Sequence, residues 1–140
     1  MRVIGIDLGE RRIGLAVSDA TATLARPLRT IERGRSDEEA ARTLLAAIDE
    51  LNAEDEVGRI VIGLPMRLDG TVSDQTARAQ KMAGLLAART AIPIVMQDER
   101  LSSHEANERL ATMERDWRKR KAKLDAAAAA VFLQDYLDRK

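Results

Sequence analysis

The sequence predicts an α/β protein in which a mixed β-sheet is flanked by helices. Apolar, β-branched segments separated only by short turns occupy the first 31 residues, and such close spacing is typical of antiparallel strands. Beyond residue 36, apolar residues at helical spacing alternate with further short apolar runs. Because helices that alternate with strands connect parallel neighbours, we expect one sheet that contains both kinds of pairing.

Three strands are expected first. Residues 2–8 form an apolar run that ends at Gly9, and residues 13–17 follow after a polar turn, so the two segments are predicted to form a hairpin. Residues 24–31 are predicted to form a third strand, in which Pro27 indicates an edge position or a bulge.

Helices and strands alternate in the rest of the chain. Ser36 with Glu39, and Ser102 with Glu105, have the form of a capping box, which indicates the start of a helix at each place. The predicted elements are helices over 36–53, 73–91, 103–115 and 124–138, and strands over 60–65 and 93–97. No repeat, linker or low-complexity boundary separates them, so residues 1–140 are expected to form a single domain.

The composition excludes several kinds of site. The 140 residues include no cysteine and one histidine, which excludes disulfides, thiolate zinc sites, a catalytic cysteine and multi-histidine metal sites. No apolar run approaches the ~20 residues of a membrane span, and the N-terminal apolar stretch is too short for a signal peptide. We therefore expect a cytoplasmic protein with no membrane partner. For the oligomeric state, which the sequence does not settle, the expectation is a monomer or a weak homodimer.

Acidic residues at three predicted element ends are the candidates for chemistry. Asp7 is a charged residue in an apolar strand, near the end where ligands collect in α/β sheets, although it could merely cap the turn at Gly9. Asp98 and Glu99 end the last strand, and because successive residues alternate faces, only one of them can point to the side of Asp7. The local sequence does not decide which. Asp125 is expected to open a helix, where the macrodipole alone would favour a carboxylate.

Three acids from separate elements at one edge of a sheet would suit a hard divalent cation. Mg²⁺ and Mn²⁺ prefer oxygen ligands and accept substrate phosphates as further ligands. Such ions stabilise the attacking and leaving oxygens in phosphodiester hydrolysis, so the protein needs no side-chain nucleophile. The candidate cofactor is therefore Mg²⁺ or Mn²⁺.

The formal net charge of zero, from 23 basic and 23 acidic residues, argues at first against a nucleic-acid partner. Resolved along the chain, however, the total hides a segment over 115–123 with six basic residues and one acidic residue. This segment is either a solvated charged loop or a contact for nucleic acid, and it contains the only tryptophan, whose ring can stack on a base. Its candidate contacts are Arg115, Trp117, Arg118, Lys119, Arg120, Lys121 and Lys123.

Further candidates lie in the predicted turns. Arg11 and Arg12 follow the first strand and are expected to contact the nucleic-acid backbone. The loop that includes Asp69, Gly70 and Thr71 is either a simple turn or a phosphate site built from backbone amides and the Thr71 hydroxyl. His104, in the first turn of a predicted helix, is expected to be solvated or hydrogen-bonded rather than catalytic.

Four segments form a recognisable pattern by their order and spacing over essentially the whole chain. They are residues 5–9 with 12–19, 61–65 with 69–71, 98–103 with 105–106, and 123–129. Together they resemble the YqgF family, also described as RuvX-like, which belongs with the RuvC-type nucleases of the ribonuclease H superfamily. The resemblance implies a ribonuclease H-like fold, with a five-stranded mixed sheet whose second strand is antiparallel, flanked by helices.

The resemblance also implies a metal-dependent nuclease, linked in bacteria to maturation of the 5′ end of small-subunit ribosomal RNA. Older descriptions of the family favour resolution of DNA junctions. By this resemblance, the catalytic and metal-binding residues are Asp7, Glu99 and Asp125. Asp98 then becomes a neighbour that pairs with Arg100, and Arg100 is also a candidate contact for nucleic acid.

The pattern departs from RuvC-type sites at one point. Such sites often have a fourth acid one helical turn beyond the third, and this chain has Ala128 and Ala129 there. Three acids would hold a second metal ion less firmly, or would rely on the substrate phosphate to hold it.

Two other functions are open alternatives. A sugar kinase or actin-like ATPase also begins with a strand, an aspartate and a glycine, but it needs two large lobes, and 140 residues supply one. A non-catalytic module that binds ribosomal precursors or transcription complexes would need only the basic segment.

Overall fold

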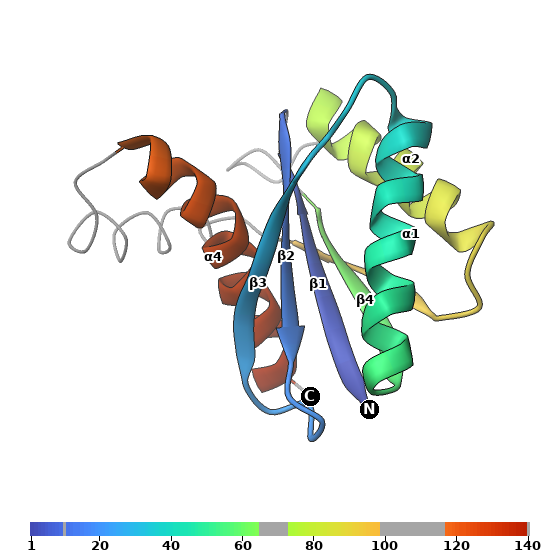
Figure 1. Ribbon diagram of the computed structural model, residues 1–140, viewed down its shortest axis with the longest axis vertical. Helices are drawn as coiled ribbons and strands as arrows, with labels where there is room; N and C mark the ends of the chain where they lie inside the picture. Colours follow the sequence, from blue (N-terminus) through green and yellow to red (C-terminus); the bar gives the residue numbers. More distant parts are fainter. Residues whose placement is uncertain (10, 65–72, 99–116, 140) are drawn as a thin grey trace.

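The computed structural model describes residues 1–9, 11–64, 73–98 and 117–139, and these residues form a five-stranded sheet in the order β3-β2-β1-β4-β5 (Figure 1). The strands are β1 (Arg2–Leu8), β2 (Arg12–Ser18), β3 (Ala25–Glu32), β4 (Val57–Leu64) and β5 (Ile94–Asp98). β2 is antiparallel to β1 and to β3, whereas β1, β4 and β5 run parallel. The predicted mixed sheet with an antiparallel second strand is therefore confirmed.

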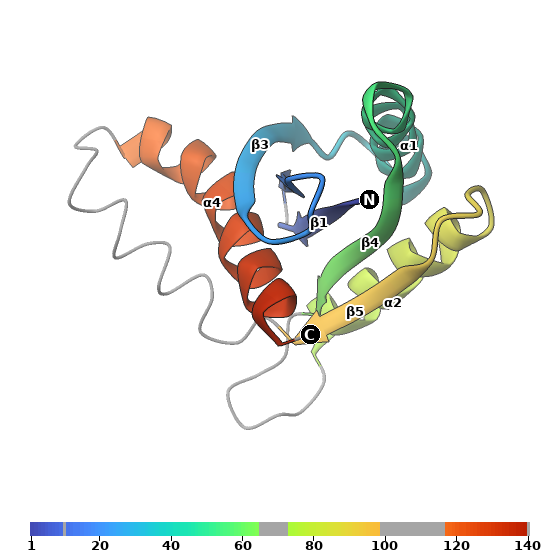
Figure 2. The ribbon, with the colours of Figure 1, turned by 90° about the horizontal axis from the view of Figure 1, so that it is seen from below.

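Helices cover both faces of this sheet. The helices with described bounds are α1 (Asp37–Glu54), α2 (Asp74–Ala87) and α4 (Trp117–Asp138). Figure 2 shows α1 and α2 on one side of the sheet and α4 on the other. Within the described ranges, no helix is both long enough and apolar enough to cross a membrane.

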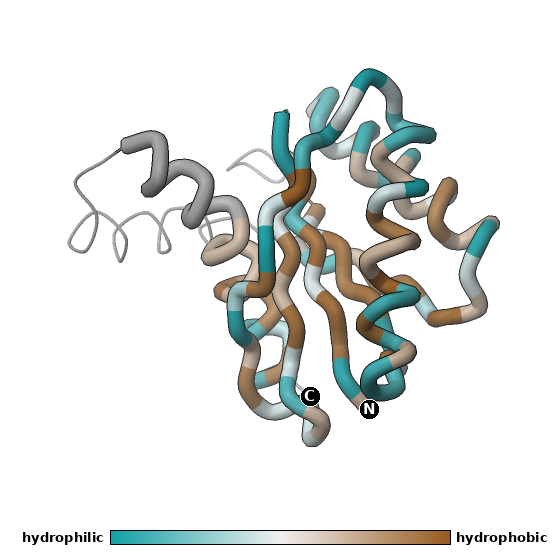
Figure 3. The backbone as a smooth tube through the Cα atoms, in the orientation of Figure 1, coloured by the Kyte–Doolittle hydropathy of each residue, from teal (hydrophilic) through white to brown (hydrophobic). Residues whose placement is uncertain are grey.

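Each face of the sheet has its own hydrophobic core. Ile4, Ile6 and Leu8 of β1 are buried in the core that α1 and α2 cover, whereas Val3 is buried in the core under α4. Hydrophobic residues therefore follow one another along the central strands between the helices (Figure 3). Burial on both faces explains why these strands read as continuous apolar runs in the sequence.

Small residues bring α4 close to the central strand. A Cβ atom on Gly5 of β1 would lie 3.0 Å from the Cβ of Leu133 and 3.3 Å from the carbonyl oxygen of Ala129. Both distances are shorter than an ordinary van der Waals contact. Gly5 therefore sets how closely the helix can approach β1.

The helices α1 and α2 begin with capping hydrogen bonds. The Ser36 hydroxyl accepts from the Glu39 amide at 3.1 Å, as predicted, but the Glu39 carboxylate accepts from the Arg35 amide at 3.1 Å instead of from Ser36. A full capping box joins Ser73 and Thr76 at the start of α2. The capping box of Ser73 and Thr76 was not predicted, because a threonine occupies the position at which a glutamate or glutamine usually indicates such a box.

Helix α4 begins seven residues earlier than predicted, at Trp117. Residues 117–123 of the basic segment are therefore helical, and the predicted helix start at residue 124 was wrong. Arginine, lysine and alanine are strong helix formers, but this stretch lacks the apolar periodicity on which the prediction relied. The predicted helix over 103–115 and the loop over 66–72 lie outside the described residues.

Candidate active site

Asp7 lies near the carboxyl end of the central strand, inside β1 rather than in the turn that follows it. The residue is 8% exposed, and its neighbours Ile6 and Leu8 are buried on the opposite face, under α1 and α2. Asp7 therefore lies on the face that α4 covers. A carboxylate with so little exposure is costly to keep ionised unless a cation or hydrogen-bond donors compensate its charge.

Glycines flank Asp7 on both neighbouring strands. Gly14 of β2 is its cross-strand partner, and Gly63 of β4 is the next position after the registered pair of Ile6 with Ile62. Strand alternation puts both glycines on the α4 face, because the residues two positions away on each strand belong to the core under α4. The two positions directly beside Asp7 on the adjacent strands therefore have no side chain.

A buried arginine holds the turn that follows Asp7. Arg33 is 6% exposed, and its Nη1 donates to the carbonyl oxygen of Gly9 at 2.8 Å. Its backbone amide donates to the carbonyl oxygen of Arg11 at 3.0 Å, and the Gly9 amide donates to that of Arg12 at 2.9 Å. A Cβ on Gly9 would lie 2.6 Å from the same Arg12 oxygen, so only glycine fits this turn without a shift of the backbone.

Asp37, in the first turn of α1, balances the charge of Arg33. Its carboxylate accepts from Arg33 Nη2 at 3.0 Å and pairs with Lys81 Nζ of α2 at 3.4 Å. The hydrogen bond from Arg33 lowers the pKa of Asp37 below its ordinary value; Lys81 lowers it further, and burial opposes both. The turn after Asp7, the start of α1 and the body of α2 are thus tied together through one carboxylate.

Asp125 lies in the interior of α4 and does not open the helix. Because α4 begins at Trp117, the macrodipole explanation for an acid at this position was wrong. Asp125 precedes Ala129 by one helical turn, and Ala129 packs over Gly5, two residues before Asp7 in β1. The backbone therefore brings the chain segment of Asp125 to the face of the sheet on which Asp7 lies. The Asp125 side chain is outside the described part of the chain.

Strand β5 runs parallel to β4 and ends one position before the predicted acid Glu99. Asp98 is its last residue, and Glu99 lies outside the described residues. Met96 packs with the core under α1 and α2, whereas Gln97 Nε2 donates to the Asp135 carboxylate of α4 at 3.0 Å. Odd-numbered positions of β5 therefore face α4, as Asp7 does.

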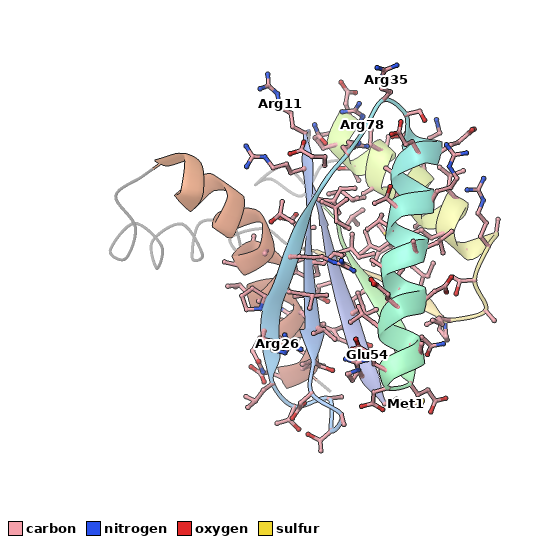
Figure 4. All side chains as sticks on the ribbon, in the orientation of Figure 1. Met1, Arg11, Arg26, Arg35, Glu54 and Arg78 are labelled. Atoms are coloured by element: carbon pink, nitrogen blue, oxygen red, sulfur yellow. The ribbon has the colours of Figure 1, made fainter. Side chains whose placement is uncertain are left out.

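The predicted nucleic-acid contacts divide into three groups. Arg11 is exposed at the end of the molecule where β1 ends, and Arg12 is half-buried at the start of β2 (Figure 4). Thr71, Arg100, Arg115 and His104 lie outside the described residues. The first residues of α4 have described backbones without described side chains, namely Trp117, Arg118, Lys119, Arg120, Lys121 and Lys123.

Arg33 was not singled out by the sequence. It lies in a charged stretch between a strand and a helix, where arginine is normally solvated. Its burial depends on Gly9, which is 24 residues earlier in the chain, so no local pattern indicates it.

Comparison with known proteins identifies the family. Residues 1–139 match the family described as "RuvX: Holliday junction resolvase". The chain belongs to the RuvX family. Two relatives in this family are both named "Putative pre-16S rRNA nuclease". The protein from Anaeromyxobacter dehalogenans strain 2CP-1 is 43% identical over all of this chain and 98% of its own, and that from Geobacillus sp. strain WCH70 is 40% identical over all of this chain and 99% of its own.

Solved structures show the fold of this RuvX protein. The structure "T. thermophilus RuvC in complex with Holliday junction substrate" aligns with a TM-score of 0.56 at 16% identity, covering 99% of this chain and 94% of that chain. The sheet order and helix placement are thus those of a ribonuclease H-like fold, as the sequence predicted. By its family, the RuvX protein is a nuclease, a hydrolase of phosphodiester bonds that acts on nucleic acid.

The RuvC-like nuclease fold points to dependence on a divalent metal ion. The described residues fit such an ion at one position, because Asp7 offers carboxylate oxygens, the ligand type that hard cations prefer, at a place flanked by glycines. Among the described residues there is no group of three histidine, cysteine, aspartate or glutamate residues that could hold a metal. The other two predicted carboxylates, of Glu99 and Asp125, fall outside that part.

Proposed function

We propose that this RuvX protein hydrolyses phosphodiester bonds with a divalent metal ion, Mg²⁺ or Mn²⁺, held by Asp7, Glu99 and Asp125. The observation that carries the proposal is the burial of Asp7 at the end of the central strand, on the α4 face and between two glycines. The bound ion would neutralise the charge that develops on the phosphate during hydrolysis.

The alternation of β5 supports Glu99 rather than Asp98 as the second acid. Gln97 faces α4, so a strand continued by two residues would direct position 99 to the face of Asp7. Asp98 is then left to pair with Arg100. This choice agrees with the one implied by the family resemblance.

The packing of α4 supports a set of three acids instead of four. Ala128 and Ala129 occupy the positions where a fourth acid would stand, and they are 2% and 0% exposed. A longer side chain at either position would have to displace the neighbours that bury these alanines. Their burial thus argues against a fourth carboxylate there.

The basic residues would position the substrate. Arg11 and Arg12 lie at the end of the sheet next to Asp7, and the first turns of α4 hold most of the basic segment. Guanidinium and ammonium groups bind backbone phosphates without reading sequence, and Thr71, Arg100 and Arg115 would add to these contacts. Because the formal net charge of the chain is zero, binding is expected to be weak and sensitive to salt.

We propose the precursor of small-subunit ribosomal RNA, cut at or near its 5′ end in the cytoplasm, as the substrate, and a monomer or weak homodimer as the active form. The names of the full-length relatives at about 40% identity support this choice. A four-way DNA junction is the second candidate, because the family is described as a junction resolvase and the RuvC structure contains that substrate.

A cleavage assay on matched RNA, single-stranded DNA and four-way junctions, each with Mg²⁺ or Mn²⁺, tests the proposal. We expect Asp7→Asn to abolish cleavage with little change in circular dichroism or melting temperature. Asp49→Asn is the matched control, because Asp49 is an exposed residue of α1. Near-normal cleavage by an Asp7→Asn protein free of contaminating nuclease would overturn the assignment.

The same variants separate an enzyme from a non-catalytic binding module. If binding alone is the function, Asp7→Asn keeps full cellular function, whereas charge reversal at Arg118 and Lys119 abolishes it. If the protein acts as an enzyme, both Asp7→Asn and the charge reversal abolish cellular function.

A further inference from the structure

Three arginines gather at the end of the molecule where β1 ends. Arg11 lies in the turn after β1, Arg35 precedes α1, and Arg78 lies in the second turn of α2. All three are exposed, and Figure 4 shows them at the same end of the molecule. Only Arg11 among them is a nucleic-acid contact predicted from the sequence.

The segments that hold these arginines are tied to one another. The Arg33 amide donates to the carbonyl oxygen of Arg11 at 3.0 Å, which joins the turn after β1 to the segment before α1. Asp37 then joins that segment to α2 through Lys81 at 3.4 Å. Arg78 precedes Lys81 by three residues, a spacing that puts the two on neighbouring positions of one helix face. The three arginines therefore stand on one connected framework.

Their guanidinium groups have no acidic partner among the residues that the structure describes. Other arginines do have one, since Arg29 pairs with Glu50 at 2.9 Å and Arg139 pairs with Asp135 at 3.0 Å. Three like charges held on one framework repel each other unless an anion lies between them.

The described acidic residues shortly after Arg35 and shortly before Arg78 in the sequence either have partners already or lie in the first turn of a helix. The Asp37 carboxylate is used by Arg33 and Lys81, and that of Glu39 accepts from the backbone amide of Arg35. Glu38 and Asp74 lie in the first turns of α1 and α2, where the helix macrodipole favours a carboxylate. The planar donors of the arginines remain available for phosphate oxygens, which they match in geometry.

We propose that Arg11, Arg35 and Arg78, here named the arginine edge, bind phosphates of the nucleic-acid strand beyond the active site, on the side away from α4. This proposal rests on the nuclease function proposed above. The strand would cross the end of β1 beside Asp7, with the basic start of α4 on one side and the arginine edge on the other. Phosphates on both sides of the cleaved bond would thus be held.

Equilibrium binding of a labelled single-stranded RNA tests the arginine edge. The measurement uses Asp7→Asn protein, so that the RNA stays intact, and compares Arg35→Gln/Arg78→Gln with Arg26→Gln/Arg89→Gln over a series of salt concentrations. Arg26 and Arg89 are exposed arginines that also lack an acidic partner in the described residues. Arg26 lies toward the opposite end of the molecule (Figure 4), and Arg89 follows the C-terminal end of α2. Both pairs remove the same charge.

Loss of one phosphate contact on a single strand lowers the slope of log Kd against the logarithm of the salt concentration by about 0.7. At 0.1 M salt, this change in slope corresponds to an affinity for RNA that is about fivefold weaker. We therefore expect the Arg35/Arg78 double variant to bind about 25-fold more weakly, with a slope reduced by about 1.4. The Arg26/Arg89 control is expected to bind as the parent does. In the background that retains Asp7, KM for RNA should rise while kcat stays near the parent value.

Equal affinities for RNA and equal salt slopes in the two double variants would overturn the proposal. The same result is expected if this surface binds another protein instead of RNA. Melting temperatures of both variants confirm that they fold. The outcome is separable from that of the nuclease assignment, since cleavage by Asp7→Asn protein refutes the latter, whereas the binding comparison tests the arginine edge alone.

Discussion

The contact between Gly5 and α4 makes a sharp prediction, because it connects the two chain segments that contain Asp7 and Asp125. Replacing Gly5 with alanine adds one methyl group at the closest point between β1 and the helix. That methyl carbon would lie 3.0 Å from the Leu133 Cβ and 3.3 Å from the Ala129 carbonyl oxygen. The change adds no charge and removes no hydrogen bond.

The expected magnitude follows from these distances. Non-bonded carbons prefer a separation of about 3.5–4.0 Å, so relief of the contact requires α4 and β1 to move apart by roughly 0.5–1 Å. Overpacking of this kind costs about 1–3 kcal/mol of stability. A displacement of about 1 Å of one catalytic group relative to another can lower the rate about 100-fold. We therefore expect Gly5→Ala to reduce kcat about 10- to 100-fold.

Urea unfolding and RNA cleavage by the folded protein measure the two effects. Gly84→Ala is the matched control, because it makes the same chemical change in α2 at a position with no atom within 4 Å of the new Cβ. Alanine there should stabilise the helix by about 0.5–1 kcal/mol and leave cleavage unchanged. A Gly5→Ala protein as active as the Gly84→Ala protein would refute the reasoning that this contact positions Asp125.

Three further predictions concern stability. Ala22 has a φ of 56°, a left-handed conformation that costs alanine about 1 kcal/mol or more, so Ala22→Gly should stabilise the protein by about 0.5–1 kcal/mol in urea unfolding. Arg33→Gln removes the buried guanidinium that joins the Gly9 carbonyl to Asp37, so it should destabilise the fold by about 2 kcal/mol or more, and unchanged unfolding would contradict the described contacts. Because the pKa of Asp37 is lowered on folding, its ionised form stabilises the protein fully above the ordinary aspartate pKa of about 3.9, and this stabilisation is lost as the pH falls through the lowered value. The stability difference between the parent and Asp37→Asn should therefore disappear in acid, and a difference independent of pH would exclude this role.

The strands were predictable because burial dictates their composition. Residues 2–8 and 13–17 are runs of β-branched and apolar side chains, and β1 and β2 occupy those positions to within one residue. The start of α4 was not predictable in this way. Its first turns contain arginine and lysine that have no buried face in the sequence pattern, so helix propensity alone would have indicated them.

The candidate site was predictable only in part. Asp7 could be singled out because a charge inside a buried strand is unusual, and the structure confirms that it is nearly buried. The choice between Asp98 and Glu99 depends on which residues of β5 face α4. The hydrogen bond from Gln97 to Asp135 shows that position 97 does, and the sequence alone does not indicate this. Arg33 acts through contacts with segments distant in sequence, and such contacts leave no local pattern.

The position of α4 in the sequence has a consequence for biosynthesis. β1 is the central strand and the first in the chain, whereas the helix that covers its Asp7 face follows all five strands. A growing chain folds from its N-terminus, so Asp7 is made long before its covering helix. Contacts between such distant segments also form slowly during folding. We therefore expect nascent chains to be inert toward RNA, and nuclease activity to begin only when α4 has been synthesised and has docked on β1.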